Sequence, residues 1–219
     1  MATSAARRRA PAHPSAGPSG PSTFDEAYYQ RFYESRRTRV QGPADAARLC
    51  RFVLAAAETL HVEVTSVAEI GAGVGLWRDW FARRKPAVRY VSTDVSPYAC
   101  KQYGHRRLDI GAARLRGRFD LVVCQGVLPY LDDDAALRAL DHLAAMTGQL
   151  LFLECQTTRD IEVVCDHDVS DPALRKRPAR FYVERLEEHM VQLGLNLWAS
   201  RALAGSIYDL ESGTLAHRG

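Results

Sequence analysis

A stretch in the first half of the chain combines an acidic residue with three glycines at alternate positions. Glu69 lies in the apolar run that begins at Val67, and Gly71, Gly73 and Gly75 follow it. Because glycine has no Cβ, the backbone at these positions can turn tightly and approach a ligand closely. The free N–H groups at the start of a following helix would face that ligand. The stretch therefore predicts a ligand-binding loop between a strand and a helix.

Two further acids follow the next two apolar runs. Asp94 lies 23 residues after Gly71, and Asp109 follows the run after that. A carboxylate at the end of a strand can accept hydrogen bonds from ribose hydroxyls. Taken singly, Asp94 could instead cap a helix and Asp109 could be a turn residue. Three acids at the ends of three consecutive strands favour ligand binding over these structural roles.

The glycines and acids can form one site only if strands and helices bring them to the same edge of a sheet. The pattern of apolar residues predicts such strands and helices. It predicts strands over 66–70, 88–93, 106–108, 119–124 and 149–154 and helices over 76–84, 97–103 and 133–146. A helix over 180–193 and strands over 195–203 and 206–210 complete the pattern. Apolar strands that alternate with helices indicate an α/β fold, a parallel sheet covered on both faces.

The N-terminal part divides at about residue 22. Residues 1–22 are rich in Ala, Pro, Ser, Gly and Arg and have no large apolar side chain, which predicts a disordered tail. A helix capped by Ser22 or Thr23 should follow, because five aromatic residues recur at helical spacing: Phe24, Tyr28, Tyr29, Phe32 and Tyr33. Pro43 is suited to the first turn of a second helix, over 43–59.

Over residues 24–210 the chain resembles the class I S-adenosylmethionine-dependent methyltransferases. The run from Glu69 to Gly75 looks like the acidic, glycine-rich signature of that family, and Asp94 looks like its ribose-binding acid. The resemblance implies a three-layer α/β/α Rossmann-like fold whose seven-stranded sheet is mostly parallel, with the last strand antiparallel. It also implies S-adenosylmethionine as the cofactor, bound by Glu69, Gly71, Ala72, Gly73, Gly75, Asp94, Val95, Asp109, Ile110, Gln125 and Tyr29.

The same resemblance assigns residues 23–219 to one methyltransferase domain. Within it, residues 23–60 would form an N-terminal helical lid, in which Tyr28, Tyr29, Tyr33 and Arg39 close over the cofactor or the acceptor. Phe24 and Phe32 are expected to pack on the sheet edge instead. Residues 155–178 would form a cap-like insertion.

Methyl transfer from a sulfonium is an in-line displacement, so positioning of the acceptor supplies much of the rate. A general base is needed only if the acceptor must lose a proton. The candidates are Glu154 at the end of a strand, Tyr130 after the fourth strand and His167 in a polar segment. Glu154 could equally be a solvated carboxylate, and Tyr130 could simply pack. No second His/Cys cluster accompanies Cys165 and His167, so no metal site is expected.

Several classes of protein are disfavoured by what the sequence contains. A nicotinamide enzyme would have its third glycine at position 76, where this sequence has Leu. The Tyr-x-x-x-Lys pair that short-chain dehydrogenases usually use in catalysis does not occur in the sequence. Enzymes similar to this family that methylate DNA bases have an Asn/Asp-Pro-Pro-Tyr motif, in place of which stands Cys124-Gln125-Gly126-Val127. Residues 1–41 have a net charge of +4, whereas the whole chain has +3, so residues 42–219 sum to −1. This nearly neutral remainder gives no support to binding of nucleic acids, RNA included.

The expected function is methyl transfer to oxygen or nitrogen of a small molecule, with secondary metabolism as the suggested setting. The alternatives are a regulatory protein that binds the cofactor without catalysis and a methyltransferase that acts on protein or RNA. No apolar run approaches the roughly 18 residues of a membrane span, so no membrane partner is expected. Five cysteines without CxxC spacing and no signal peptide predict reduced thiols and a cytoplasmic protein.

Overall fold

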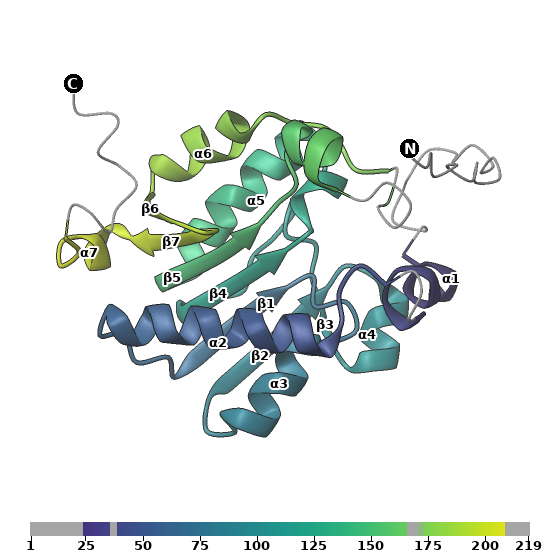
Figure 1. Cartoon of the computed structure of the whole chain (residues 1–219), viewed down its shortest axis with the longest axis horizontal. Coiled ribbons are helices and arrows are strands. Elements are labelled where there is room, and N and C mark those ends of the chain that lie inside the picture. Colours follow the sequence, from purple (N-terminus) through teal and green to yellow (C-terminus); the bar gives the residue numbers. More distant parts are fainter. Residues whose placement is uncertain (1–23, 36–38, 166–170, 172, 209–219) are drawn as a thin grey trace, which may run out of the picture.

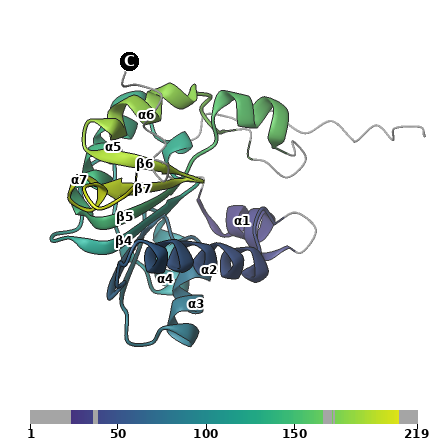
Figure 2. The same ribbon diagram turned by 60° about the vertical axis from the view of Figure 1, so that its left-hand side comes forward.

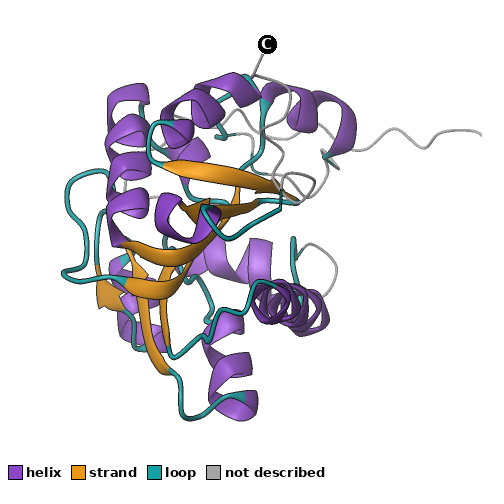
Figure 3. Ribbon diagram, turned by 90° about the vertical axis from the view of Figure 1, so that its left-hand side faces the viewer, coloured by secondary structure: helices purple, strands orange, loops and turns teal. Residues whose placement is uncertain are grey.

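The computed structural model describes residues 24–35, 39–165, 171 and 173–208. The predicted tail (1–22) and His167 lie outside these residues. The part of the chain that is described contains one sheet of seven strands: β1 (Ser66–Ile70), β2 (Arg89–Asp94), β3 (Arg106–Arg107), β4 (Phe119–Gln125), β5 (Thr147–Glu154), β6 (Met190–Gly194) and β7 (Leu197–Ser200). Helices lie on both sides of these strands (Figure 3).

The strand order is β3-β2-β1-β4-β5-β7-β6. The first five strands in this order are parallel to their neighbours, and β7 is antiparallel to both β5 and β6. Figure 2 shows β4, β5, β7 and β6 side by side. The predicted Rossmann-like sheet, mostly parallel with an antiparallel last strand, is confirmed.

Two long helices, α2 and α5, run along the sheet, and shorter helical segments join the strands (Figure 1). The α-helices are α1 (Glu26–Tyr29), α2 (Pro43–Thr59), α3 (Leu76–Arg84), α4 (Pro97–Tyr103), α5 (Asp133–Met146), α6 (Ala179–Glu187) and α7 (Arg201–Ala204). Side chains cap α4 and α5 among others: Ser96 accepts from the N–H of Ala99 in α4, and Asp132 accepts from the N–H of Ala135 in α5. The remaining turns are η2 (Gln30–Glu34), η3 (Leu128–Tyr130) and η4 (Asp160–Val164).

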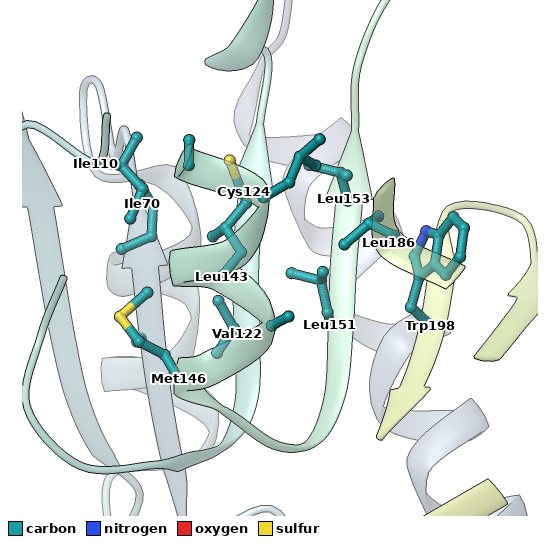
Figure 4. Close-up of a cluster of buried hydrophobic side chains, with 14 of the residues drawn as sticks. Ile70, Ile110, Val122, Cys124, Leu143, Met146, Leu151, Leu153, Leu186 and Trp198 are labelled. Carbon is teal, nitrogen blue, oxygen red and sulfur yellow. The ribbon is translucent and has the colours of Figure 1, made fainter. Parts of the chain in front are cut away.

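Successive side chains of a strand point to opposite sides of the sheet. Because helices cover both sides, the central strands are buried on both faces. Val122 and Leu151 pack against Leu143 and Met146 of α5 on one face (Figure 4). On the other face, side chains of β4 and β5 pack with α2 and α3. The two clusters hold the parallel strands in register, so that their carboxyl ends meet at one edge.

The C-terminal elements differ from the prediction. The predicted helix over 180–193 ends at Glu187, and β6 begins at Met190 after a two-residue turn. The predicted strand over 195–203 is shorter, since α7 follows β7. Of the predicted strand over 206–210, the described residues 206–208 are not a strand. The reason is a tight turn: Leu195 and Asn196 have φ values of 49° and 67°, which suit a two-residue hairpin between β6 and β7.

The N-terminal aromatic segment also differs in detail. The helix α1 begins at Glu26, and Asp25 caps it by accepting from the N–H of Tyr28. The predicted caps, Ser22 and Thr23, lie outside the described residues. The wider helical turn η2 follows, with the N–H of Ser35 donating to the carbonyl of Gln30 at 3.0 Å. None of the helices in the described ranges is long and apolar enough to cross a membrane.

One carboxylate at the opposite edge of the sheet predicts a pH-dependent stability. Asp120 Oδ2 accepts from the N–H and hydroxyl of both Thr65 and Ser66, over 2.7–2.9 Å. Burial raises the pKa of Asp120, but these hydrogen bonds outweigh it and hold the pKa below its usual value. Its stabilisation is therefore present above the unfolded-state pKa of about 4 and is lost as the pH falls through the folded-state pKa.

We expect Asp120→Ala to lower the free energy of unfolding by about 1–3 kcal/mol at pH 7, and by progressively less below about pH 4. Urea denaturation across this pH range measures the difference. Glu63→Ala, which removes an exposed carboxylate, is the control and should show little change. A loss that is the same at pH 3 and pH 7 would contradict the assignment.

Candidate active site

The glycine-rich loop runs from the end of β1 to the start of α3, at the edge where the parallel strands end. Gly71, Gly73 and Gly75 have φ values of 72°, 57° and 79°, in the left-handed region that favours glycine. The Gly71 position is also crowded, since a Cβ there would lie 2.2 Å from Cγ2 of Val127. Glycine is therefore required at residue 71 by both its backbone conformation and its neighbour.

The carboxylate of Asp94 is 5% exposed and binds this loop directly. Oδ2 accepts from the N–H of Gly73 at 2.9 Å, and Oδ1 accepts from the N–H of Ser96 at 2.8 Å. The hydroxyl of Tyr29 donates to Oδ1 at 3.4 Å. Burial raises the pKa of Asp94, while the two backbone donors act against that rise. The end of β2 is thus attached to the loop after β1.

His105 also binds this loop through a hydrogen bond. Its Nε2 lies 3.0 Å from the carbonyl oxygen of Gly73, and its Nδ1 lies 2.9 Å from the hydroxyl of Ser92. A carbonyl only accepts, so Nε2 carries the proton and Nδ1 accepts from the hydroxyl. Burial lowers the pKa of His105, which favours this neutral form.

A first cavity opens above the loop. Its lining includes nine of the residues predicted to bind cofactor or act in catalysis: Tyr29, Gly71, Gly73, Asp94, Val95, Asp109, Ile110, Gln125 and Tyr130. Ile110 is buried, whereas Asp109 is exposed and accepts from the N–H of Gly111 at 2.9 Å. Phe24 also lines this cavity, so its expected role as packing on the sheet edge is incomplete.

A second cavity adjoins the first and is lined on one side by α2. The two share Tyr33, Ile70, Gly71, Gly73, Gln125 and Gly126. Glu69, Ala72 and Glu154, all predicted site residues, line only the second cavity. Gly75 lines neither, and it lies at the N-terminus of α3.

Glu69 is buried and accepts from the hydroxyl of Tyr90 at 2.8 Å. Burial raises its pKa to about 8, with the Tyr90 hydrogen bond acting against the rise. The carboxyl group of Glu69 is therefore mostly neutral at pH 7.

A chain of three side chains crosses the second cavity from α3 to β5. The indole N–H of Trp77 donates to Oε1 of Gln125 at 3.1 Å. Trp is a donor only, so this bond directs the amide NH2 of Gln125 toward Glu154. That NH2 lies 3.2 Å from each carboxyl oxygen of Glu154. Burial raises the pKa of Glu154, and the Gln125 hydrogen bond opposes it.

A hydrogen-bonded group of phenols closes the first cavity on the side of residues 24–35. The hydroxyls of Tyr28 and Tyr130 lie 3.0 Å apart, and Tyr130 donates to Oδ2 of Asp171 at 3.1 Å. Burial raises the pKa of both phenols, so they remain protonated. This group joins the predicted lid, η3 and the predicted insertion.

Sequence reasoning missed four residues of this arrangement: Trp77, Tyr90, His105 and Asp171. Trp77 alone gave a local signal, since it stands two residues after Gly75. The other three act across the fold and have no motif. His167 lies outside the described residues. Within the described ranges, no group of three or more His, Cys, Asp or Glu side chains is placed to hold a metal ion.

Residues 37–205 match a family model described as a methyltransferase domain. The chain belongs to this methyltransferase family. It is therefore a methyltransferase, and the predicted enzyme class is confirmed together with its cofactor, S-adenosylmethionine. No curated protein has a significantly similar sequence.

Solved structures share the methyltransferase fold at low sequence identity. A sugar N-methyltransferase from a Streptoalloteichus species is 15% identical over 90% of this chain and 98% of its own, with a TM-score of 0.56. The magnesium protoporphyrin IX methyltransferase from Synechocystis, with bound S-adenosylmethionine, is 14% identical over 85% of this chain and 100% of its own, with a TM-score of 0.55. DesVI from Streptomyces venezuelae is 14% identical over 71% and 91%, with a TM-score of 0.54.

The crowding at Gly71 can be tested against a second glycine of the same backbone conformation. Gly104 has φ of 74°, and a Cβ there would meet nothing within 4 Å. Each Gly→Ala change forces alanine into the left-handed region, at about 1–2 kcal/mol. Gly71→Ala should cost roughly 1–3 kcal/mol more, because the new methyl overlaps Val127.

Urea denaturation of both variants measures this difference. The double variant Gly71→Ala/Val127→Ala should lose less stability than the sum of the losses in the two single variants, because removing the valine methyls relieves the overlap. Equal destabilisation by Gly71→Ala and Gly104→Ala would show that the close approach has no energetic consequence.

Proposed function

We propose that this methyltransferase transfers the methyl group of S-adenosylmethionine to oxygen or nitrogen of a small-molecule acceptor. The observation that carries the proposal is the position of Asp94, a buried carboxylate bonded to the Gly73 N–H and facing the same cavity as Asp109 and Ile110. A carboxylate so placed suits a ribose diol. Ile110 and Val95 supply apolar surface for an adenine ring beside it.

The loop fits the remainder of the cofactor. Its glycines allow close approach of a ligand to the backbone at Gly71 and Gly73, and Ala72 adds only a methyl group. Gly75 begins α3, while Gln125 and Glu69 border the loop from β4 and β1. When bound, S-adenosylmethionine supplies an electrophilic methyl group on a sulfonium. Tyr29 donates to Asp94 and is proposed to hold the carboxylate in place.

The space beside the loop favours a small acceptor. The second cavity measures about 390 Å³, within the roughly 300–1,000 Å³ of small-molecule sites, and the adjoining first cavity adds about 180 Å³. The sugar and magnesium porphyrin enzymes with this fold are named for small-molecule acceptors, which supports the same class here. Glu154 and Tyr130 are the described candidates for contact with the acceptor, while the proposed role of His167 rests on sequence alone.

The role of Asp94 can be tested by cofactor binding. Asp94→Ala removes a charged hydrogen-bond acceptor worth about 1.5–3 kcal/mol, so the Kd for S-adenosylhomocysteine should rise roughly 10- to 150-fold. Isothermal titration calorimetry measures this change, and circular dichroism checks that the variant is folded. Asp134→Ala, an exposed carboxylate of α5, should leave the Kd unchanged. Equal Kd values for Asp94→Ala and the wild type would remove Asp94 from the cofactor site.

The acceptor class has its own test. The wild-type protein is mixed with methyl-labelled S-adenosylmethionine and either a small-molecule extract or desalted protein and RNA. We expect label to move into the small-molecule fraction. Transfer to protein or RNA would support the alternative substrates, and cofactor binding without transfer to any fraction would support a regulatory protein.

A further inference from the structure

We propose that the acceptor is an amine, bound as an ammonium ion in the second cavity by the carboxylate of Glu154. This proposal rests on the proposed function and deepens it, since the family and fold leave oxygen and nitrogen acceptors equally open. It follows from the balance of charge around the strand ends, from the partners of Glu154 and from the aromatic side chains beside it.

The described residues that line the two cavities carry few positive charges. No Lys or Arg is among the described residues that line the first cavity. In the second, the one described basic residue is Arg48, which is 68% exposed and binds Asp45 at 2.9 Å. Within the described part of the chain, the site therefore has no unpaired cation that could bind a negatively charged acceptor. A carboxylate or phosphate acceptor would enter against Asp94, Asp109 and Glu154.

The other carboxylates around the cavities already have strong donors. Asp94 accepts from two backbone N–H groups, and Asp45 accepts from Arg48 and from the N–H of Gly42. Asp109 accepts from the N–H of Gly111. Glu69 is buried and accepts from the hydroxyl of Tyr90, and burial favours its neutral form. Glu154 differs from all of them.

Among the described residues, the carboxylate of Glu154 accepts hydrogen bonds from one neutral amide, the NH2 of Gln125, which lies 3.2 Å from both oxygens. A carboxylate has about four lone-pair sites, so most of its capacity to accept faces the cavity. Trp77 fixes the orientation of that amide, which keeps the carboxylate in place for a ligand. Glu154 is partly buried, and a carboxylate shielded from water in this way is stabilised more by a cation than by a neutral hydroxyl.

Aromatic side chains add to the preference for a cation. Tyr33 and Trp77 line the second cavity together with Glu154. The face of an aromatic ring attracts an ammonium group within about 6 Å. Tyr33 is the partly exposed ring of the two, because Trp77 is 2% exposed and packs against Phe152. The raised pKa of Glu154 agrees with a carboxyl group that lacks a positive partner, since burial disfavours its charge.

The chemistry of the step follows from this contact. The ammonium of the acceptor gives a proton to Glu154, which leaves a neutral amine with a free electron pair. The amine nitrogen then forms a bond to the sulfonium methyl carbon, while the electron pair of the C–S bond returns to sulfur. The products are a methylated ammonium ion, S-adenosylhomocysteine and protonated Glu154, which releases its proton to solvent.

The test uses three probes that share one ring and differ in charge: benzylamine, benzyl alcohol and benzoate. Their affinities for wild-type protein saturated with S-adenosylhomocysteine are measured by calorimetry at pH 7. We expect benzylamine to bind at least about tenfold more tightly than the other two. Its affinity should rise with pH as Glu154 loses its proton, because the carboxylate then pairs with the ammonium.

Glu154→Gln keeps the shape and removes the charge. It should weaken benzylamine at least about tenfold, leave benzyl alcohol within about twofold and leave the Kd of S-adenosylhomocysteine unchanged. Glu58→Gln, the same change at an exposed position of α2, should alter none of the three probes. This control separates a local contact from the overall charge of the protein.

Three results would overturn the proposal: benzyl alcohol or benzoate binding as tightly as benzylamine, no binding of benzylamine, or equal benzylamine affinity in Glu154→Gln and wild type. Weaker S-adenosylhomocysteine binding in Glu154→Gln would also overturn it, by assigning the carboxylate to the cofactor instead. Wild-type protein that fails to bind S-adenosylhomocysteine would refute the proposed function itself, so the two failures are distinguishable.

Discussion

The hydrogen bond between the Gly73 N–H and the Asp94 carboxylate is the contact on which the site depends. It joins the loop after β1 to the end of β2 at 2.9 Å, and the Ser96 N–H joins the same carboxylate to the start of α4. A buried anion satisfied by two main-chain donors does not require a positive side chain nearby. The strand ends can therefore form a pocket with acidic groups and little positive charge, which is unusual for a site that must hold several polar ligand groups.

The acids of the site are stabilised in different ways, and this difference carries functional information. Asp94 uses backbone N–H groups, while Glu69 remains mostly protonated beside Tyr90. Both solutions are complete without a ligand. Glu154 has only the Gln125 amide, so the charge of that carboxylate is compensated least by the described protein atoms. A ligand that brings a positive charge would gain more at Glu154 than at either of the other acids.

The central part of the fold could be predicted because its local and long-range signals agree. The strands up to β5 are short apolar runs, and the loop from Gly71 to Gly75 has both a backbone and a steric reason for its glycines. The prediction failed after Glu187, where apolar residues continue at a spacing that also fits a helix. The deciding feature was the turn at Leu195 and Asn196, and leucine with positive φ is not a turn signal in sequence.

The site shows the same division. The glycines and acids at strand ends belong to local patterns, so their gathering around one edge could be inferred before any contact was known. Trp77, Tyr90 and His105 act on residues 21 to 48 positions away, through single side-chain hydrogen bonds. No periodicity encodes such pairs, because each depends on which strands are neighbours and on side-chain direction. The side chains that orient the predicted acids, amide and glycine loop through hydrogen bonds were therefore the least predictable.

The aromatic segment before α2 adds a constraint of shape to this constraint of charge. The wide turn of η2 keeps Tyr29 and Tyr33 close, with ring centroids 5.7 Å apart, and Tyr33 borders both cavities. Tyr28 reaches η3 through the hydroxyl of Tyr130. Because burial keeps these phenols protonated, they present rings and neutral hydroxyls to a ligand. In the first cavity, these phenols then select the acceptor by its size and hydrogen bonding. Selection of the acceptor by charge is proposed for Glu154, which lines the second cavity.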